Sequence, residues 1–395
     1  MATARRAVPV SRLVVRADRS AFAFILAAVL VEMVFFIVLG PLLPHYASTL
    51  HMSKLGAGLL SASYAAGCGL AAIPAGLVTG ALGARGVTIG GLLLVGVACG
   101  GFALADSAAT LDAARIVQGV GAAAVWSGAI AWLMAIGGEG DRGRLIGLTF
   151  SAAGVGACVG PAVGAIAQIA GPRSVFLVLS AVILTLAAMG LAIARRTPAP
   201  RSDRRDGAGM RTALLDGGTR RALLVVALPS IGYGVVGVLV PLRLHALGAT
   251  AATIAGAYIA AALLETVASP LVGGFYDRRG ATVVLRATLV AAVVSALAFA
   301  VQPPLLLLLL TLAVSGPVIG AVWVPALGEL MSAAERVGAG AGIALGLFNL
   351  CWAATQTFAA VGGAQLARSS EAAPFVVLAT LYALAGLSAR ALSRP

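Results

Sequence analysis

Three charged residues, Glu32, Arg115 and Glu265, lie inside long apolar stretches of the sequence. A charged side chain at the centre of a bilayer costs about 3 kcal/mol on insertion scales, so residues of this kind are candidates for function. A carboxyl group in such a place can bind and release a proton, and a nearby arginine can assist the transfer. The sequence therefore predicts proton-coupling chemistry at these three positions.

Each of the three residues also has a structural interpretation. Glu32 lies about twelve residues into its stretch, or ~18 Å at ~1.5 Å per residue, and could there be a permanently neutral acid bonded to a neighbouring helix. Glu265 could pair with a polar group on another helix, or it could bind a cation. Arg115 lies about one turn from the outer end of its stretch, so its side chain could reach outward to the membrane surface.

Polar and aromatic side chains recur at helical spacing beside these charges. They are the predicted substrate-binding residues: Phe36, Tyr64, Gln118, Trp126, Tyr258, Asn349, Trp352 and Gln356. Aromatic rings beside carboxylates attract lipophilic cations, whereas each ring alone could serve packing only. The three candidate charges, one arginine against two glutamates, favour cations and protons over anions as the transported species.

The stretches that hold these residues predict membrane-spanning helices. The chain has 395 residues, 60% of them hydrophobic and 10% charged, where soluble domains have about 25% charged residues. A spanning helix needs about 20 apolar residues. Such stretches cover 20–44, 56–79, 87–105, 111–136, 145–170, 174–194, 222–246, 252–275, 282–301, 304–328, 338–366 and 373–392. We therefore expect an all-α membrane protein with twelve transmembrane helices in a lipid bilayer.

The basic residues indicate how these helices cross the membrane. A net charge of +13 could suggest nucleic-acid binding, but 22 of the 27 basic residues lie in the tails and connections on one side. The opposite side holds four, which are Lys54, Arg173, Arg243 and Arg368, and Arg115 lies within a helix. In membrane proteins the loops on the cytoplasmic side carry an excess of Lys and Arg. The sequence thus predicts a multi-pass protein of the inner cell membrane with both termini cytoplasmic and no nucleic-acid partner.

The sequence has no arrangement typical of catalysis or of a cofactor. No Ser-His-Asp set, nucleotide motif or metal-ligand cluster is visible, so we expect neither an enzyme nor a bound metal or cofactor. The cysteines all fall inside apolar stretches and are predicted to be free thiols: Cys68, Cys99, Cys158 and Cys351.

An internal repeat divides the chain into two halves. Gly119 and Trp126 recur as Gly316 and Trp323, at an offset of 197 residues. This pattern predicts two pseudo-symmetric six-helix bundles, a common plan of transporters. The predicted parts are a cytoplasmic tail 1–19, an N-terminal bundle 20–194, a cytoplasmic linker 195–221 and a C-terminal bundle 222–395.

The charged positions do not follow the repeat. Their counterparts in the other half are uncharged: Gly232 for Glu32, Leu312 for Arg115 and Cys68 for Glu265. A symmetric frame with asymmetric polar groups indicates a site between the two halves.

Four short motifs accompany these helices. Their residues are Gly76, Gly83 and Arg85 at and beyond the end of the second stretch; Gly273, Asp277, Arg278 and Gly280 at and beyond the end of the eighth; Arg115, Gln118 and Gly119 in the fourth; and Gly156, Gly160, Pro161 and Gly164 in the fifth. Together they resemble the motifs of the major facilitator superfamily, most closely those of its twelve-helix drug/proton antiporters. The motif after the second stretch departs from the family pattern, with Gly80 in place of an acid.

The resemblance implies alternating access by two rocking halves, with gating roles for the motif residues and proton transfer linked to Arg115. Our leading hypothesis is a monomeric, proton-coupled exporter of lipophilic small molecules or drugs, with protons and the cargo as its partners. Two alternatives remain: a proton-coupled uptake symporter for a nutrient or metabolite, and a non-transporting receptor or scaffold on the same fold.

Overall fold

The computed structural model describes residues 19–136, 142–196, 208–339 and 341–388, and these residues form helices without any strand. The helices are α1 Arg19–Ile37, α2 Leu39–Thr49, α3 Lys54–Leu82, α4 Ala84–Leu104, α5 Ala108–Ile136, α6 Arg142–Ala170, α7 Pro172–Arg196, α8 Ala208–Leu215, α9 Gly217–Ala246, α10 Ala251–Arg279, α11 Ala281–Ala300, α12 Leu305–Gly320, α13 Trp323–Arg336, α14 Ala341–Leu366 and α15 Ala373–Leu387. The predicted tail, except Arg19, and 197–207 of the predicted linker lie outside the described residues, as do Arg390 and Arg394.

The described helices confirm an all-α membrane fold. Eleven spans are long and apolar enough to cross a bilayer, counting α1 with α2 and α12 with α13 as one span each. The fifteen-residue α15 is apolar but shorter. The expected number of twelve is therefore matched by eleven full spans and one shorter helix. Large apolar side chains on the outside, such as Leu70, Ile169 and Leu306, are 71–84% exposed, as suits contact with lipid.

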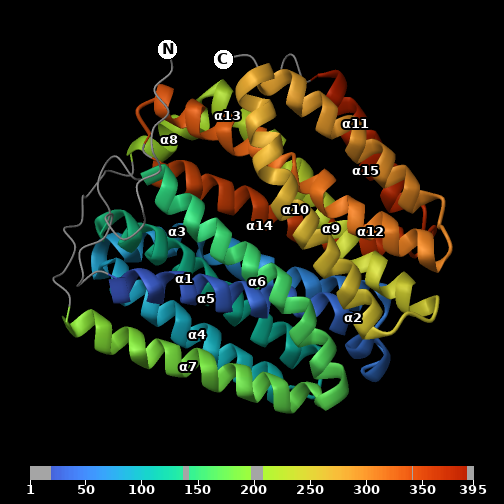
Figure 1. The fold of residues 1–395 in the computed structure, drawn as a ribbon, viewed down its shortest axis with the longest axis horizontal. Helices are drawn as coiled ribbons and strands as arrows, with labels where there is room; N and C mark the ends of the chain where they lie inside the picture. Colours follow the sequence, from blue (N-terminus) through green and yellow to red (C-terminus); the bar gives the residue numbers. More distant parts are fainter. Residues whose placement is uncertain (1–18, 137–141, 197–207, 340, 389–395) are drawn as a thin grey trace.

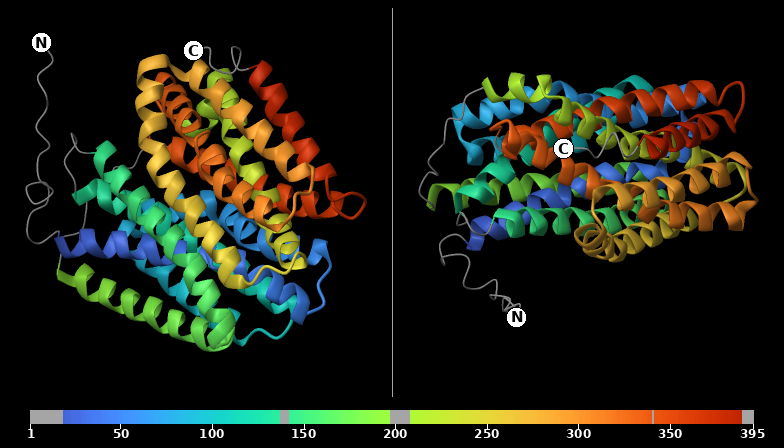
Figure 2. Two further views of the ribbon diagram at one scale, coloured as in Figure 1. Left: turned by 45° about the vertical axis from the view of Figure 1, so that its right-hand side comes forward. Right: turned by 90° about the horizontal axis from the view of Figure 1, so that it is seen from above.

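The helices form two bundles, one from each half of the chain. In Figure 1 the helices up to α7 occupy the lower part and those from α9 onward the upper part, and Figure 2 shows the same separation from another side. Two seams join the bundles, where α3 packs against α14 and α6 packs against α10. Each seam pairs helices that are far apart in sequence, so a change in either seam alters how the halves fit together.

Two spans are broken. The first is interrupted at Val38, between α1 and α2, and Pro41 and Pro44 follow closely. The other is interrupted between α12 and α13, a few residues after Pro317. Proline lacks the backbone N–H that continues the hydrogen-bond ladder of a helix, so carbonyl groups near these breaks need other partners.

The connection between the bundles includes the short helix α8. It is followed by Asp216, which caps the start of α9. Its carboxylate accepts a hydrogen bond from the backbone N–H of Thr219 at 2.7 Å, and this bond lowers the pKa of the Asp216 carboxyl.

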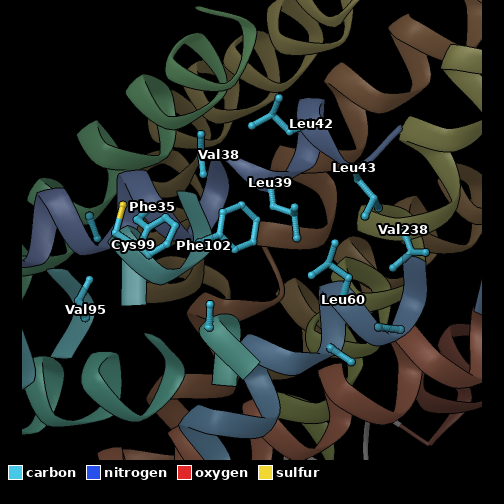
Figure 3. Packing of buried hydrophobic residues seen from close by; sticks show 14 of the residues in the cluster. Phe35, Val38, Leu39, Leu42, Leu43, Leu60, Val95, Cys99, Phe102 and Val238 are labelled. Carbon is cyan, nitrogen blue, oxygen red and sulfur yellow. The ribbon is translucent and has the colours of Figure 1, made fainter. Parts of the chain in front are cut away.

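The core of the N-terminal bundle forms around the first span. Phe35 of α1 is completely buried against Phe102 and Phe176, with ring centroids 6.0 and 5.7 Å away. Leu60 of α3 and Val238 of α9 belong to the same buried cluster, so the packing continues across both halves (Figure 3). The first span is thus held on several sides, which fixes the residues that it carries.

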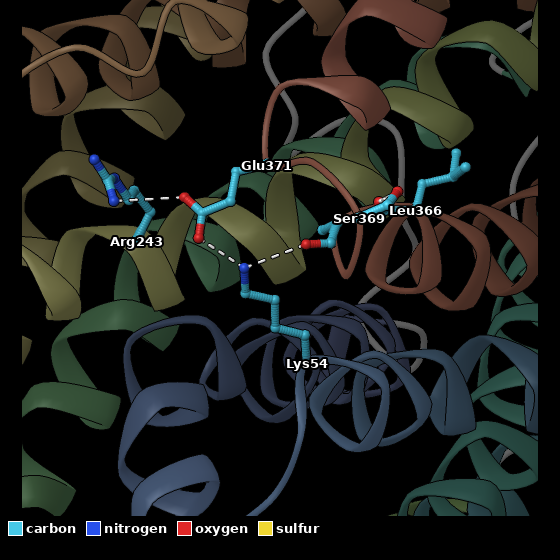
Figure 4. A network of polar contacts seen from close by, with 6 residues as sticks. Lys54, Arg243, Leu366, Ser369 and Glu371 are labelled. Atoms are coloured by element: carbon cyan, nitrogen blue, oxygen red, sulfur yellow. Dashed lines mark hydrogen bonds and ion pairs between the residues drawn. The ribbon is translucent and has the colours of Figure 1, made fainter.

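One end of the molecule is closed by contacts between the halves, and we call it the closed end. Lys54 Nζ lies 2.7 Å from Glu371 Oε1, and Arg243 Nη1 lies 3.4 Å from Glu371 Oε2 (Figure 4). Close by, a Cβ placed on Gly58 of α3 would lie 2.9 Å from the carbonyl oxygen of Ala360 in α14. The two helices therefore meet here too tightly to admit a side chain.

Candidate functional site

A large cavity lies between the bundles and opens toward the end opposite the closed one, which we call the mouth. It encloses about 2140 Å³, more than the 300–1,000 Å³ of most ligand pockets. Its lining begins at Ser61, in the first third of α3, and reaches Gly83 just after that helix, so the cavity extends along most of α3 to the mouth. Both halves contribute walls, as the sequence predicted for a site between them.

Glu32 of α1 is completely buried beside this cavity and is not itself part of its lining. The Tyr64 hydroxyl donates to Glu32 Oε1 at 2.5 Å, and Trp126 Nε1 donates to Oε2 at 3.0 Å. Tyr64 and Trp126 both line the cavity. They therefore separate the acid from the cavity, and each oxygen of the carboxyl has its own donor.

Arg115 of α5 is 2% exposed, so its side chain does not reach outward as the structural interpretation supposed. Its Nη1 donates to the carbonyl oxygen of Phe35 at 3.1 Å and to Gln118 Oε1 at 2.7 Å, and Nη2 donates to the carbonyl oxygen of Phe36 at 3.3 Å. These carbonyls belong to the last turn of α1, next to its break. The guanidinium thus supplies donors where the helix ladder is interrupted, and it lies 5.1 Å from the centroid of the Tyr64 ring.

Three predicted aromatic residues meet across the seam between the halves. Phe36 and Tyr64 stack with centroids 4.4 Å apart. Trp352 of α14 packs edge-on against both rings, at 6.0 and 6.3 Å. Tyr64 therefore contacts both the buried acid and the opposite bundle.

Glu265 of α10 forms a second acid–tyrosine pair in the other half. The Tyr233 hydroxyl of α9 donates to Glu265 Oε2 at 3.0 Å. In the first half the acid lies on the first span and the tyrosine on the second, whereas here the tyrosine lies on the first span and the acid on the second. Glu32 and Glu265 therefore lie at different positions of the repeat. Each half still forms one acid–tyrosine pair between its first and second spans, with the acid and the tyrosine on opposite spans in the two halves.

The remaining predicted binding residues also line the cavity, except Gln118, which is buried behind it. Tyr258 packs against Gly40 of α2, so it lies where the two halves meet. Asn349 and Gln356 line the cavity from α14, on the same helix as Trp352. The structure thus brings most of the predicted set to one space.

The glycine motif of the fifth stretch lies in α6 and packs on the first span. A Cβ on Gly160 would lie 3.0 Å from the carbonyl oxygen of Val34, and one on Gly164 would lie 2.7 Å from that of Val38. Gly156 faces Leu30 in the same way, and Pro161 lies within α6 between these contacts. The motif therefore sets the distance between α6 and the helix that carries Glu32.

The two loop motifs are mostly helical, which differs from their predicted place in connections. Gly76 lies in α3, and Gly273, Asp277 and Arg278 lie in the last turns of α10. Only the final glycines are non-helical: Gly83 and Gly280 have φ of +85° and +78°, which other residues rarely adopt. Arg85 follows Gly83, and its guanidinium lies 5.6 Å from the centroid of the Trp132 ring. In both motifs the helix continues almost to the final glycine, so the connection to the next helix is this one glycine residue.

Sequence reasoning missed three aromatic residues of the second half that line the cavity, Tyr233, Trp323 and Phe348. Trp323 was noted only as the repeat of Trp126, although that repeat could have suggested an equivalent role. Tyr233 follows Gly232, the counterpart of Glu32, and no spacing rule predicts a pair built from exchanged helices. Among the described residues, no group of three His, Cys, Asp or Glu side chains is placed to hold a metal ion.

The overall architecture is similar to that of known protein structures. Solved structures of a bacterial homologue of the human lysosomal transporter Spinster cover 96% of this chain and 99% of that chain. The inward-facing, unoccupied form has a TM-score of 0.73 at 14% identity, and the inward-facing, occupied form has 0.69 at 15%. At such identity the likeness shows the fold alone.

Two curated sequences are similar to part of the chain. The MFS-type transporter ppzB of Metarhizium rileyi (strain RCEF 4871) is 31% identical over 138 residues, and that of Metarhizium majus (strain ARSEF 297) is 30% identical over 125 residues. The matches cover 34% and 32% of this chain, and 29% and 27% of those relatives. The chain thus matches less than a third of the length of either relative.

A sequence model of the Major Facilitator Superfamily matches residues 24–360. This match spans both bundles and includes both acid–tyrosine pairs. It shows that the chain belongs to the Major Facilitator Superfamily, whose members are membrane transporters and not enzymes.

Proposed function

We propose that the protein is a proton-coupled exporter of lipophilic small molecules, which moves its cargo by alternating access to the central cavity. The observation that carries this proposal is the placement of Glu32. This acid is completely buried, and both of its hydrogen-bond donors, Tyr64 and Trp126, are walls of the cavity.

The geometry links the charge on Glu32 to the seam between the halves. A deprotonated carboxyl accepts from both donors, and protonation removes the negative charge that holds them. Tyr64 stacks on Phe36 and touches Trp352 of the other bundle. Protonation of Glu32 therefore weakens its hydrogen bond from Tyr64, whose ring contacts Trp352 of the opposite half.

The groups around Glu32 allow its carboxyl to be protonated and deprotonated. Arg115 is the nearby cation, but it donates to Gln118 and to carbonyls of α1, and no ion pair to Glu32 occurs within 4 Å among the described residues. Tyr64 and Cys68 are the other titratable groups close to the acid. Because Arg115 does not neutralise Glu32 directly, the carboxyl can take up or release a proton once Tyr64 or Trp126 moves and opens it to the cavity. In this proposal Arg115 assists the transfer and fixes the break of the span, while Glu265 has a supporting role.

The proposed direction rests on charge and on the motifs. If the basic tails and connections lie in the cytoplasm, the mouth faces the cytoplasm, the side from which an exporter takes its cargo. The two solved structures of similar fold are described as inward-facing, and the glycine motif of α6 resembles that of drug/proton antiporters. We propose a monomer in the inner membrane, with both termini cytoplasmic, and with protons and lipophilic drugs as its partners.

Reconstitution in liposomes with an imposed pH gradient tests this function. We expect wild-type protein to move a lipophilic dye against the direction of proton flow. Glu32→Gln should lose the dependence on the gradient. Asp112→Asn is a matched control, because Asp112 of the same bundle accepts a hydrogen bond from Ser63 and does not line the cavity.

Three outcomes would contradict the proposal. If Glu32→Gln moves dye at the wild-type rate with unchanged dependence on the gradient, Glu32 does not couple transport to protons. Movement of cargo and protons in the same direction would indicate an uptake symporter. Specific binding without any movement would indicate a receptor or scaffold.

A further inference from the structure

The two acid–tyrosine pairs differ in how completely their carboxyl groups are bonded. Both oxygens of Glu32 have donors, and the acid is sealed from the cavity. Glu265 accepts from Tyr233 through Oε2 only, and no described residue donates to its Oε1. Glu265 is also the one acidic side chain among the described residues that line the cavity. One half thus holds a saturated, enclosed carboxyl, and the other an incompletely bonded, accessible one.

Aromatic rings surround the accessible carboxyl. Tyr233 and Trp323 stack nearly parallel, at 10° with centroids 6.5 Å apart, and Phe348 packs on Trp323 at 5.2 Å. The three rings come from α9, α13 and α14 and line the same cavity as Glu265. Ring faces attract cations, most strongly where water is excluded.

No cation of the described part of the chain neutralises Glu265. Arg115 is the other charged residue among the described lining, and its guanidinium is engaged with α1 and Gln118 on the opposite bundle. An unpaired carboxylate in an apolar space is unfavourable unless a partner or a proton joins it. An added Cβ on Gly320 would collide with the Glu265 carboxyl, so the absence of a side chain there leaves room for this acid.

We propose that Glu265, Tyr233, Trp323 and Phe348 form the binding site for an organic cation that carries aromatic groups. Glu265 supplies the counter-charge through its free oxygen, and the rings of Trp323 and Phe348 contact the aromatic groups of the ligand. The cation site then lies in the second half, while the sealed Glu32 of the first half exchanges the proton. This assignment rests on the proposed function insofar as the cavity is the place that takes cargo.

Equilibrium binding tests the site without any transport. Purified full-length protein in detergent is titrated calorimetrically with tetraphenylphosphonium and with tetraphenylborate, two ions of similar size and opposite charge, at one pH. We expect wild-type protein to bind the phosphonium and to discriminate against the borate. Glu265→Gln should weaken phosphonium binding roughly thirtyfold or more, since it removes the counter-charge of the bound cation. Trp323→Leu should weaken it about fivefold.

Two control variants separate the site from general effects of charge. Asp112→Asn removes one acid outside the cavity and should bind phosphonium as wild-type protein does. Glu32→Gln fixes that position in a neutral form, so it should bind phosphonium less tightly than wild-type protein but still prefer phosphonium to borate. Should Glu265→Gln prove unstable, Glu265→Asp retains the charge and must still prefer the phosphonium to the borate, and Trp323→Leu must still bind it less tightly.

The proposal fails if Glu265→Gln binds phosphonium with wild-type affinity. It fails equally if Glu32→Gln no longer prefers phosphonium to borate, because the counter-charge would then lie elsewhere. Proton-driven export of a neutral dye by wild-type protein that does not bind phosphonium would overturn the cation site and leave the proposed function intact.

Discussion

Replacing Glu371 by Gln should loosen the closed end and shift the protein toward a state that is open there. Glu371 precedes α15 and is shared by Lys54 and Arg243. Lys54 begins α3 of the first half, whereas Arg243 and Glu371 both belong to the second. The substitution therefore removes one ion pair between the halves and leaves the packing at Gly58 in place.

The size of the effect follows from the distance and the exposure of this pair. Lys54 Nζ and Glu371 Oε1 are 2.7 Å apart, but the side chains are 38% and 39% exposed. Water screens a pair of this exposure, and such pairs contribute about 0.2–1 kcal/mol. The ratio of open to closed molecules should rise about 1.5- to fivefold, the factor to which that energy range corresponds. High salt should produce a change of the same sign.

Pulsed electron paramagnetic resonance would report this shift as a change in the distance between spin labels at Thr49 and Ser369. Both positions are exposed and lie at the closed end in different halves. The labels require a variant in which the four native cysteines are replaced. Asp106→Asn is the control, because Asp106 is an exposed acid in the connection from α4 to α5 at the same end. An unchanged distance distribution in Glu371→Gln, or an equal change in Asp106→Asn, would refute the reasoning.

Two further substitutions test how the first span is held. Arg115→Lys should reduce dye flux under a pH gradient by about tenfold, since lysine lacks the planar fork that serves two carbonyls at once; wild-type flux would contradict this role. Gly160→Ala places a Cβ 3.0 Å from both Ile37 Cβ and the Val34 carbonyl oxygen, so overpacking of about 1–3 kcal/mol should lower its unfolding temperature. Gly147→Ala of the same helix meets nothing within 4 Å and is the control, so equal unfolding temperatures of the two variants would contradict the packing argument.

The fold could be predicted from the sequence because a bilayer imposes simple rules on length and polarity. A buried acid such as Glu32 stands out in an apolar stretch, and the repeat of Trp126 as Trp323 shows two halves before any contact is known. The extent of the helices was less predictable. The motif after the second stretch contains small residues without marked apolar character, yet α3 continues to Leu82, and the chain turns only where Gly83 adopts a positive φ.

The site could be predicted only in part, because sequence spacing describes one helix at a time. The sequence predicts that Glu32 and Arg115 act together, but both donors of Glu32 lie on other helices, and Arg115 bonds to the carbonyls beside the break after α1 and not to the acid. The pair of Tyr233 and Glu265 depends on how α9 meets α10. The contact of Lys54 with Glu371 joins residues 317 positions apart, so only the packing of the two bundles brings it about.

Proton release on cargo binding tests the coupling role of Glu32 most directly. Purified protein in weakly buffered solution, with a pH-sensitive dye, is mixed with saturating tetraphenylphosphonium. If a proton on Glu32 and the cargo disfavour each other, linkage requires that bound cargo expel the proton. Glu265 can also release a proton when the cation joins it, so the account predicts that Glu32→Gln still binds the cation but releases fewer protons than wild-type protein. Release of the same size from Glu32→Gln would contradict it.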